Sequence, residues 1–320
     1  MTHKGFNKSS GRLLVITYHY VREQGGMYPG IHPVSVEELS NHIDQLKQKY
    51  HPASIEQVAK FSSGEKPLDR DSFLMTFDDG LQDHYKNVRN VLIQQNINGV
   101  FFIPTLPYSN GISPAVHKIH WLRANTDPDE FIVLLNRALP DKWSNLRISK
   151  EDQKRASKMH IHDDFKTQVL KFSLNFVIPY NIVNQAMSNI FILKGIKEDD
   201  FCRNTFMNAK QVRELAEDGN MIAMHGHSHV PFTSLNEQLL DRDIEKNSEN
   251  IKSILGVRPN WLSYPYGRPD AIPDNVDKFC QRHKIDIAFS LISGINQFGN
   301  SSTSLKRITP NEINKYLGSR

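Results

Sequence analysis

Two clusters of side chains in this sequence could carry out chemistry. The first is Asp78-Asp79, at the end of the apolar run Ser72 to Phe77 and followed at once by Gly80. Consecutive strand residues point to opposite faces, and the glycine allows a turn, so the two carboxylates can lie in different environments. One of them could bind a metal while the other stays free as a base. A solvated Asp-Asp-Gly turn is the alternative.

The second cluster is His225-Gly226-His227-Ser228-His229, which follows the apolar stretch Met221 to Met224. His225 and His229 are four residues apart, so on a helical turn both imidazoles lie on one face. That spacing suits two nitrogen ligands of one divalent cation. His227 would then point elsewhere. A surface cluster is the alternative, and the buried strand expected before it argues against that interpretation.

The two clusters together indicate a catalytic metal site. Two histidines and one carboxylate leave coordination positions open for water and substrate. A metal held this way activates water and polarises a carbonyl oxygen. The remaining carboxylate of the Asp pair supplies a base. What such a site still needs is a proton donor for the leaving group.

The elements that must position these residues alternate between strands and helices. Apolar runs predict strands at 12–18, 72–77, 99–103, 221–224, 261–264, 285–291 and 305–308, and helical patterns lie at 36–50, 85–97, 209–217 and 236–255. This alternation indicates an α/β fold with a parallel sheet, and about seven strands in 320 residues favour a barrel-like closure. In such folds chemistry sits at the carboxyl ends of the strands, where the expected strands place His19, the Asp pair, His225 and Tyr266.

The region from about 108 to 205 breaks this alternation, because it is helical and polar. No Gly/Ser/Pro linker marks its edges, so we expect a helical insertion over the strand ends, within a single domain that spans 1–320. The insertion either covers the site or forms a structural layer on the solvent side. Trp121 in this region is a possible substrate contact, since an indole face suits a pyranose ring. Packing in a core is the alternative.

Composition excludes several classes of protein. Lys+Arg 39 against Asp+Glu 35 leaves a net charge of only +4, and without a basic run this argues against nucleic acid as a partner. The two cysteines do not make a disulfide scaffold. No run of apolar residues is long enough to span a membrane. The polar N-terminus does not read as a signal peptide, so we expect a cytoplasmic protein. No pattern specifies an oligomeric state.

Three ordered motifs resemble those of the NodB-homology polysaccharide deacetylase family. They are Thr76-Phe77-Asp78-Asp79-Gly80, His225-x-x-x-His229 and Tyr264-Pro265-Tyr266-Gly267. The resemblance covers most of the chain, with the helical region as an insertion. It implies a distorted barrel of about seven strands and helices, and metal-dependent hydrolysis of the N-acetyl group of an amino sugar.

The resemblance also implies a role for each motif residue. Asp78 looks like the general base, and Asp79, His225 and His229 look like the metal ligands. Tyr266 matches the tyrosine whose backbone N–H helps to hold the oxyanion. The expected cofactor is one divalent metal, zinc above all, although such a site also accepts cobalt, nickel or iron.

One departure from the family pattern concerns the general base. Many members carry an arginine three residues before the motif tyrosine, and this arginine steadies the base. Ser263 occupies that place here. Arg258 and Arg268 are the nearby substitutes that the sequence offers.

A second departure concerns the proton donor. Many members carry the acid histidine in a C-terminal strand, yet no histidine follows His283. Tyr18-His19-Tyr20-Val21 resembles instead the N-terminal histidine motif of the poly-N-acetylglucosamine deacetylase branch. This resemblance implies that His19 is the proton donor. A histidine buried at the barrel end for structural reasons is the alternative.

The sequence therefore predicts a hydrolase that removes the N-acetyl, or another N-acyl, group from an amino sugar of a carbohydrate. In a cytoplasmic chain, the substrate would be a precursor of a surface polysaccharide. The same residues would also serve O-deacetylation or deformylation. The rival prediction is a catalytically inactive carbohydrate-binding or scaffolding module on the same barrel, which the missing motif arginine and C-terminal histidine would fit.

Overall fold

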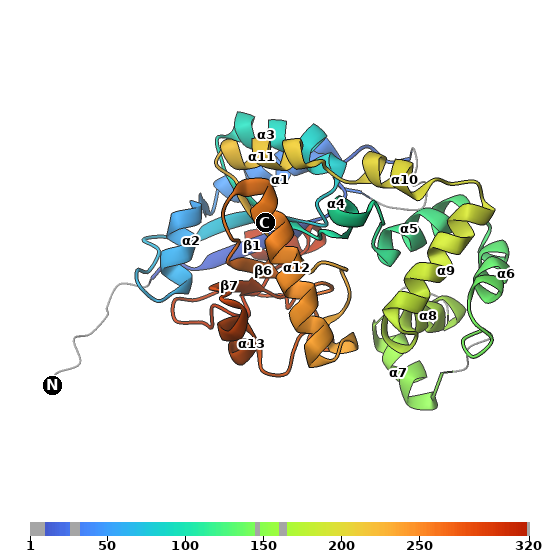
Figure 1. Ribbon diagram of the computed structural model, residues 1–320. Coiled ribbons are helices and arrows are strands. Elements are labelled where there is room, and N and C mark those ends of the chain that lie inside the picture. The colour runs from blue at the N-terminus through green and yellow to red at the C-terminus, as the bar shows by residue number, and fades with distance from the viewer. Residues whose placement is uncertain (1–9, 26–32, 145–147, 160–164, 319–320) are drawn as a thin grey trace.

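A parallel sheet forms the centre of the protein (Figure 1). The computed structural model describes residues 10–25, 33–144, 148–159 and 165–318. The strands are β1 (Leu13–Tyr18), β2 (His51–Pro52), β3 (Ser72–Asp78), β4 (Gly99–Ile103), β5 (Met221–Met224), β6 (Trp261–Ser263) and β7 (Ile287–Phe289). Their order is β1-β3-β4-β5-β6-β7, each neighbouring pair is parallel, and β2 pairs with the start of β3.

The sheet curls and is closed by residues 305–308, a segment that is not a regular strand. The Leu305 N–H donates to the Ala288 carbonyl of β7 at 2.9 Å, and the Ile308 N–H donates to the Val15 carbonyl of β1 at 2.9 Å. Parallel bridges accompany both bonds. The predicted distorted α/β barrel is therefore confirmed, with its irregular side between β7 and β1.

The strands are buried on both faces, as expected for a parallel sheet covered by helices. In β1, Leu13 and Val15 belong to the cluster that fills the inside of the sheet, together with Phe102. Leu14 and Ile16 alternate with them and pack against the surrounding helices. This period of two follows from the pleat of the strand, which turns successive side chains to opposite faces.

Helices surround the sheet. They are α1 (Val36–Lys47), α2 (Ile55–Ser62), the π-helical turn η1 (His84–Val88), α3 (Arg89–Gln95), α11 (Ala209–Glu217), the short turn η3 (Phe232–Ser234), α12 (Glu237–Leu255), α13 (Val276–His283), the short turn η4 (Pro310–Glu312) and α14 (Ile313–Leu317). All but α2 pack on the outer face of the sheet, whereas Val58 and Phe61 of α2 pack against the inner cluster. Reciprocal caps begin several of them: Ser35 pairs with Glu38 at α1, and Asn208 pairs with Gln211 at α11. The helix expected at 85–97 is divided between η1 and α3.

The residues between β4 and α11 form helices, as expected for about 108–205. They are α4 (Leu106–Asn110), α5 (Ala115–Asn125), α6 (Pro128–Ala138), α7 (Lys150–Met159), α8 (Phe165–Phe172), the π-helical turn η2 (Ser173–Val177), α9 (Tyr180–Leu193) and α10 (Glu198–Thr205). Figure 1 shows α5 to α9 gathered on one side of the sheet. They have a hydrophobic core of their own, which includes Leu122, Phe131 and Phe191. The assignment of the whole chain to one domain stays a prediction.

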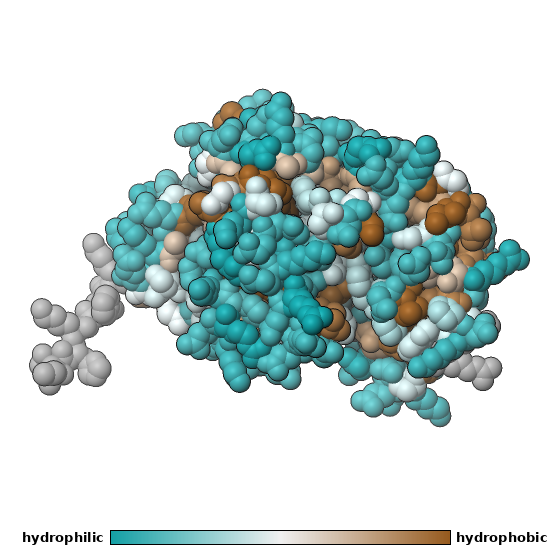
Figure 2. All heavy atoms as spheres, in the orientation of Figure 1, coloured by the Kyte–Doolittle hydropathy of each residue, from teal (hydrophilic) through white to brown (hydrophobic). Residues whose placement is uncertain are grey.

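The surface is mostly hydrophilic on the face seen in Figure 2, and its hydrophobic areas are more frequent over the insertion helices at the right. The large hydrophobic side chains exposed in the insertion are Val133, Phe165, Ile192 and Leu193. Among the described residues, none of the helices combines the length and the hydrophobicity needed to cross a lipid bilayer.

Candidate active site

The two adjacent aspartates separate at the end of β3 because the backbone turns sharply there. Asp78 is the last residue of the strand, whereas Asp79 and Gly80 have φ values of 80° and 63°. This left-handed conformation is costly for Asp79, and glycine is the residue that adopts it freely. A Cβ at position 80 would also lie 2.9 Å from the Ile103 side chain. Gly80 thus allows the turn that directs Asp78 and Asp79 differently.

Asp79 lies against both predicted histidine ligands. Its Oδ1 atom is 2.9 Å from His229 Nε2 and 3.4 Å from His225 Nε2. One donor atom from each of these three buried residues lies within 4.8 Å of the other two. The structure therefore brings the three predicted metal ligands together, although they come from loops after β3 and β5.

The histidine loop is irregular, so the helical turn considered for it from the sequence is wrong. Gly226 and His229 have φ values of 70° and 54°, which interrupts any helix between the two ligands. Buried Asp243 of α12 holds the loop by accepting the His227 N–H at 2.6 Å and the Ser228 N–H at 3.0 Å. His225 and His229 thus converge through the loop fold.

His227 points away from this cluster, as the sequence predicted. Its Nδ1 lies 3.0 Å from the hydroxyl of Thr105, in the segment between β4 and α4. Burial lowers the pKa of His227 to about 4, so its imidazole is neutral at neutral pH.

The donor set fits a divalent cation. His225 Nδ1 lies 2.8 Å from the Ser263 carbonyl, which can only accept, so Nδ1 carries the hydrogen and Nε2 presents its lone pair toward Asp79. Within the described part of the chain, the buried Asp79 Oδ1 makes no hydrogen bond of regular geometry. A buried carboxylate oxygen without such a bond is costly, and a cation between it and the two Nε2 atoms would satisfy it.

Asp78 is held by Arg307, which the sequence analysis did not identify. Both side chains are almost fully buried, and two bonds of 2.8 Å join Arg307 Nη1 to Asp78 Oδ1 and Nη2 to Oδ2. The Ser263 hydroxyl donates to Asp78 Oδ2 at 3.2 Å and accepts from Arg307 Nη2 at 2.8 Å. Burial is the largest single influence and would raise the pKa of Asp78, but the charges of Arg307 and His225 and the hydrogen bonds from Arg307 together outweigh it and hold this pKa below its usual range.

Arg307 therefore takes the role of the motif arginine, for which the sequence offered Arg258 or Arg268 as substitutes. The small side chain of Ser263, at the motif position, leaves room for Arg307. Arg258 is paired on the surface with Glu245 at 2.7 Å, so it is not the substitute. A signal for Arg307 exists in the sequence: in an extended segment, residues 305 and 307 share one face, and Leu305 faces the inside of the barrel. An arginine on that face must find a buried carboxylate.

His19, the predicted proton donor, lies just beyond the end of β1 and is exposed. Its backbone carbonyl is 2.9 Å from Nε2 of buried His84, which fixes the chain at this point. The charge of His19 contributes to lowering the pKa of Asp78, so the two side chains are electrostatic neighbours. The structure thus brings His19 to the same barrel end as the other predicted residues.

His117 of insertion helix α5 also reaches this cluster. The histidine is fully buried, its Nε2 lies 3.5 Å from Asp79 Oδ2, and its Nδ1 lies 2.9 Å from the Tyr20 hydroxyl. Burial lowers the pKa of His117 to about 3, so the imidazole is neutral. If Tyr20 donates to Nδ1, the hydrogen sits on Nε2 and faces Asp79. The insertion therefore contributes directly to the surroundings of a predicted metal ligand.

Trp121 is partly buried and packs against the core of the insertion. Its ring meets Phe191 edge-on at 5.8 Å between centroids and Phe201 at 6.4 Å. These contacts agree with the packing alternative raised for this residue, and its role in substrate binding stays a prediction.

Tyr266 has its backbone in the left-handed region, with a φ of 63°, and Gly267 follows at 59°. Its ring centroid is 5.5 Å from that of His229, and its hydroxyl donates to Asn175 Oδ1 in η2 at 3.2 Å. A non-glycine residue held in this conformation is typical of functional sites. Tyr266 thus joins the metal cluster to the insertion.

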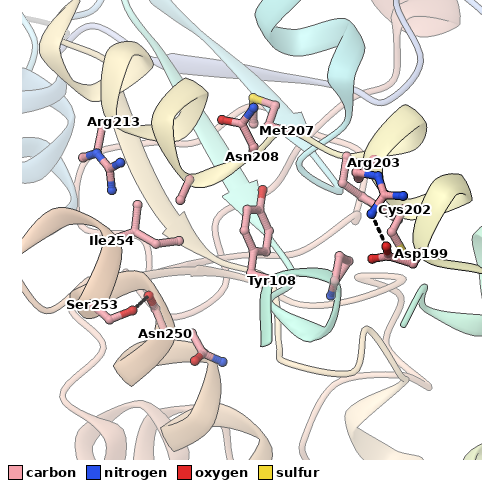
Figure 3. Close-up of a pocket in the computed structure, with 13 residues that line it drawn as sticks. Tyr108, Asp199, Cys202, Arg203, Met207, Asn208, Arg213, Asn250, Ser253 and Ile254 are labelled. Atoms are coloured by element: carbon pink, nitrogen blue, oxygen red, sulfur yellow. Dashed lines mark hydrogen bonds and ion pairs between the residues drawn. The ribbon is translucent and has the colours of Figure 1, made fainter. Parts of the chain in front are cut away.

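Two adjacent hollows lie on this side of the cluster. A small one of about 20 Å³ is lined by His229 and Tyr266, and a neighbouring cavity of about 230 Å³ shares Tyr266 and Asn175 with it. A larger cavity of about 590 Å³ lies elsewhere, around Tyr108 and between α10, α11 and α12 (Figure 3). None of the predicted catalytic residues lines that larger cavity, so the chemistry locates the active site better than cavity size does.

Comparisons with known proteins agree with this geometry. The family model described as polysaccharide deacetylase matches residues 176–287. The uncharacterized protein YlxY of Bacillus subtilis (strain 168) is 29% identical over 94 residues, which are 29% of this chain and only 27% of that relative's length.

Two solved structures share the fold over nearly the whole chain. IcaB from Ammonifex degensii has a TM-score of 0.57 at 14% identity, with 97% of both chains covered. The Streptococcus pyogenes deacetylase PplD, in complex with acetate, has a TM-score of 0.60 at 12% identity, with 97% of this chain and 100% of that chain covered. With the family match and the assembled motifs, this common fold leads to one conclusion. Residues 176–287 match the polysaccharide deacetylase family, and the chain as a whole has the fold of IcaB and of the deacetylase PplD.

Proposed function

We propose that this protein is a metal-dependent deacetylase that hydrolyses the N-acyl group of an amino sugar in a polysaccharide or in its precursor. The observation that carries the proposal is the cluster of Asp79, His225 and His229, whose donor atoms lie within 4.8 Å of one another. It lies next to a second carboxylate, Asp78, which Arg307 keeps ionised. A metal-ligand set beside an ionised base is what hydrolysis of an amide requires.

The three clustered side chains would hold the metal, for which zinc is the best match to two imidazoles and one carboxylate. When bound, such a metal supplies Lewis-acid activation of water and of the substrate carbonyl. His225 is prepared for this by its bond to the Ser263 carbonyl, which places the hydrogen of the neutral ring on Nδ1 and leaves Nε2 as the nitrogen that can bind a metal.

Asp78 would accept the proton of the attacking water. An ionised carboxylate has about four acceptor sites. Arg307 Nη1 occupies one on Oδ1, and Arg307 Nη2 and the Ser263 hydroxyl occupy two on Oδ2. One site on Oδ1 therefore remains for the proton. The bidentate contact also fixes the orientation of the carboxylate, so Arg307 acts as a positioning residue.

Tyr266 and His19 would complete the reaction. The main-chain N–H of Tyr266 would donate to the oxygen that becomes negative when the amide carbon turns tetrahedral. His19 would give a proton to the departing amine, and its exposure lets it exchange protons with solvent afterwards. Together these groups supply a base, an oxyanion contact and an acid.

Release of acetate from N-acetylated sugars tests the proposal. The metal-loaded protein should release acetate from oligomers of N-acetylglucosamine, and Asp78→Asn should abolish the release while metal content stays unchanged. Chelation of the metal should stop the reaction, and zinc should restore it. O-acetylated and N-formylated analogues in the same panel distinguish the acyl group that is removed.

The alternative is a carbohydrate-binding module without catalysis. It requires that the loaded protein binds such sugars and releases no acetate from any of them. The bidentate contact between Arg307 and Asp78 speaks against it, because this contact replaces the motif arginine whose absence favoured the alternative.

A further inference from the structure

His120 of the insertion helix α5 lines the cavity of about 230 Å³ that lies beside the metal cluster. The walls of this cavity and of the small hollow at His229 have several residues in common, among them Tyr266 and Asn175. The charges of Asp79 and His229 act on the imidazole of His120, so these side chains are electrostatic neighbours. His120 therefore stands next to the space that a substrate at the proposed metal site would fill.

The two hollows differ in what they can hold. The one at His229, of about 20 Å³, has room for about one water molecule, which is similar in size to a carbonyl oxygen. Cavities of roughly 300–1,000 Å³ hold drug-sized ligands, so the neighbouring one of about 230 Å³ suits a smaller ligand, such as a single sugar ring. Its walls combine apolar side chains such as Ile119, Leu174 and Phe176 with polar ones, as is usual for small-molecule sites. A sugar whose N-acyl oxygen lies at His229 would therefore place its ring beside His120.

The hydroxyl of Tyr20 determines which ring nitrogen of His120 can accept a hydrogen bond. This hydroxyl lies 2.9 Å from His117 Nδ1 and 3.4 Å from His120 Nδ1. Ionised Asp79 can only accept, so the neutral ring of His117 carries its hydrogen on Nε2, which faces this carboxylate. His117 Nδ1 then accepts the single hydrogen of the Tyr20 hydroxyl. The Tyr20 oxygen in turn accepts from His120, whose hydrogen is therefore on Nδ1.

Nε2 of His120 is left with its lone pair. Burial lowers the pKa of His120 to about 4, so the ring is neutral and has no second hydrogen. Among the described residues, no hydrogen bond is found for this Nε2 atom, and it does not belong to the unpaired atoms that are sealed from solvent. A ligand in the cavity can therefore donate a hydrogen bond to it, and hydroxyl groups are the donors that a sugar ring offers.

We propose that His120 is a substrate-binding residue whose Nε2 accepts a hydrogen bond from a hydroxyl of the sugar that carries the N-acyl group. The inference rests on the proposed function and adds to it a residue of the insertion that determines specificity. A sugar that lacks this hydroxyl would leave Nε2 unpaired in the closed site, and such a mismatch is how polar sites reject analogues.

The test compares the methyl glycoside of N-acetylglucosamine with its 3-deoxy, 4-deoxy and 6-deoxy analogues. For wild type, we expect kcat/KM to fall about five- to tenfold for one of the three analogues, mainly through KM, since one neutral hydrogen bond is lost. The analogue that shows this penalty identifies the hydroxyl that His120 binds.

Variants assign the penalty to His120. His120→Phe keeps a flat ring without the acceptor, so it should lower kcat/KM for the parent sugar and make the parent and the penalised analogue equal. Its metal content should stay at the wild-type level, since His120 is not among the proposed ligands. His120→Gln should retain part of the penalty, because its side-chain amide offers an acceptor oxygen. His42→Phe is the matched control: His42 Nδ1 also lies against a tyrosine hydroxyl, that of Tyr18 at 3.0 Å, but on outer helix α1.

The outcomes separate this inference from the proposed function. If the parent sugar releases acetate but all three analogues react equally well, or if His120→Phe leaves the penalty intact, His120 has no such role while the deacetylase function stands. If no sugar releases acetate, the proposed function fails, and calorimetry with the same sugars decides about His120. One deoxy analogue that binds more weakly to wild type, but not to His120→Phe, supports the contact. Equal affinity, or no binding of any of these sugars, rejects it.

Discussion

Arg307 and Asp78 form a bidentate ion pair inside the barrel, with both bonds at 2.8 Å. The pair joins the irregular segment that closes the sheet to the end of β3. Because the partner of the proposed base lies on the closing segment, the base is oriented only when this segment closes the barrel.

The first prediction concerns this pair. Arg307→Met should lower kcat by about a hundredfold or more and destabilise the fold by roughly 3–5 kcal/mol, since it leaves Asp78 buried and unpaired. Arg307→Lys should lose less stability, because it keeps a charge without the fork. Lys306→Met, on the exposed face of the same segment, is the matched control for thermal denaturation and kinetics. Wild-type rate and stability in Arg307→Met would show that the pair has no role.

The second prediction concerns the metal. Asp79→Asn, His225→Ala and His229→Ala should each lose most of the bound metal in elemental analysis, since each removes one of three donors. His227→Ala lies in the same loop but bonds to Thr105, so it should keep about one equivalent. Stoichiometric metal in both His225→Ala and His229→Ala would exclude this site.

The third prediction separates His19 from the metal ligands. His19→Ala should keep its metal and lower the rate on amides by roughly 10²–10⁴, the contribution of a positioned acid. The loss should be smaller for an activated aryl ester, whose leaving group needs no proton. His51→Ala, at an exposed histidine of β2, should change neither value. Unchanged amide hydrolysis in His19→Ala would assign the proton donor elsewhere.

The fourth prediction concerns the insertion. His117→Phe removes the imidazole that lies 3.5 Å from Asp79 Oδ2, and metal affinity should fall about 10- to 100-fold, as for other groups behind a metal ligand. Tyr20→Phe should have a smaller effect in the same direction. His42→Phe is the matched control, because His42 also lies against a tyrosine hydroxyl, that of Tyr18, but on outer helix α1. Competition with a chelator measures all three affinities, and equal values would remove His117 from the site.

The fifth prediction tests the two interpretations of Trp121. If the ring is a core residue, Trp121→Ala should destabilise the protein by about 3 kcal/mol with little change in KM. Phe201→Ala, its ring partner, should behave alike. A raised KM with unchanged thermal stability would instead establish Trp121 as a sugar contact.

Local sequence was sufficient for the parts of the fold that local patterns encode. The runs at 99–103 and 221–224 are β4 and β5, and 209–217 is α11. Burial on one or both faces of such an element gives its hydrophobic residues a spacing that is visible within a short stretch of sequence. The Asp-Asp-Gly and His-x-x-x-His motifs were visible for the same reason, since each is a short segment at a strand end. The shape of the histidine loop was not visible, because it depends on Asp243 of α12.

The sequence alone thus determined the order of the strands along the chain and the residues that could bind a metal. Only the tertiary structure decided which arginine orients Asp78 and which insertion residue faces Asp79. Arg307 is 229 positions from Asp78, and no local pattern links two residues so distant. Their pairing follows from closure of the barrel, which buries both charges. Removing each charge from water is costly, and the attraction between the two side chains offsets that cost.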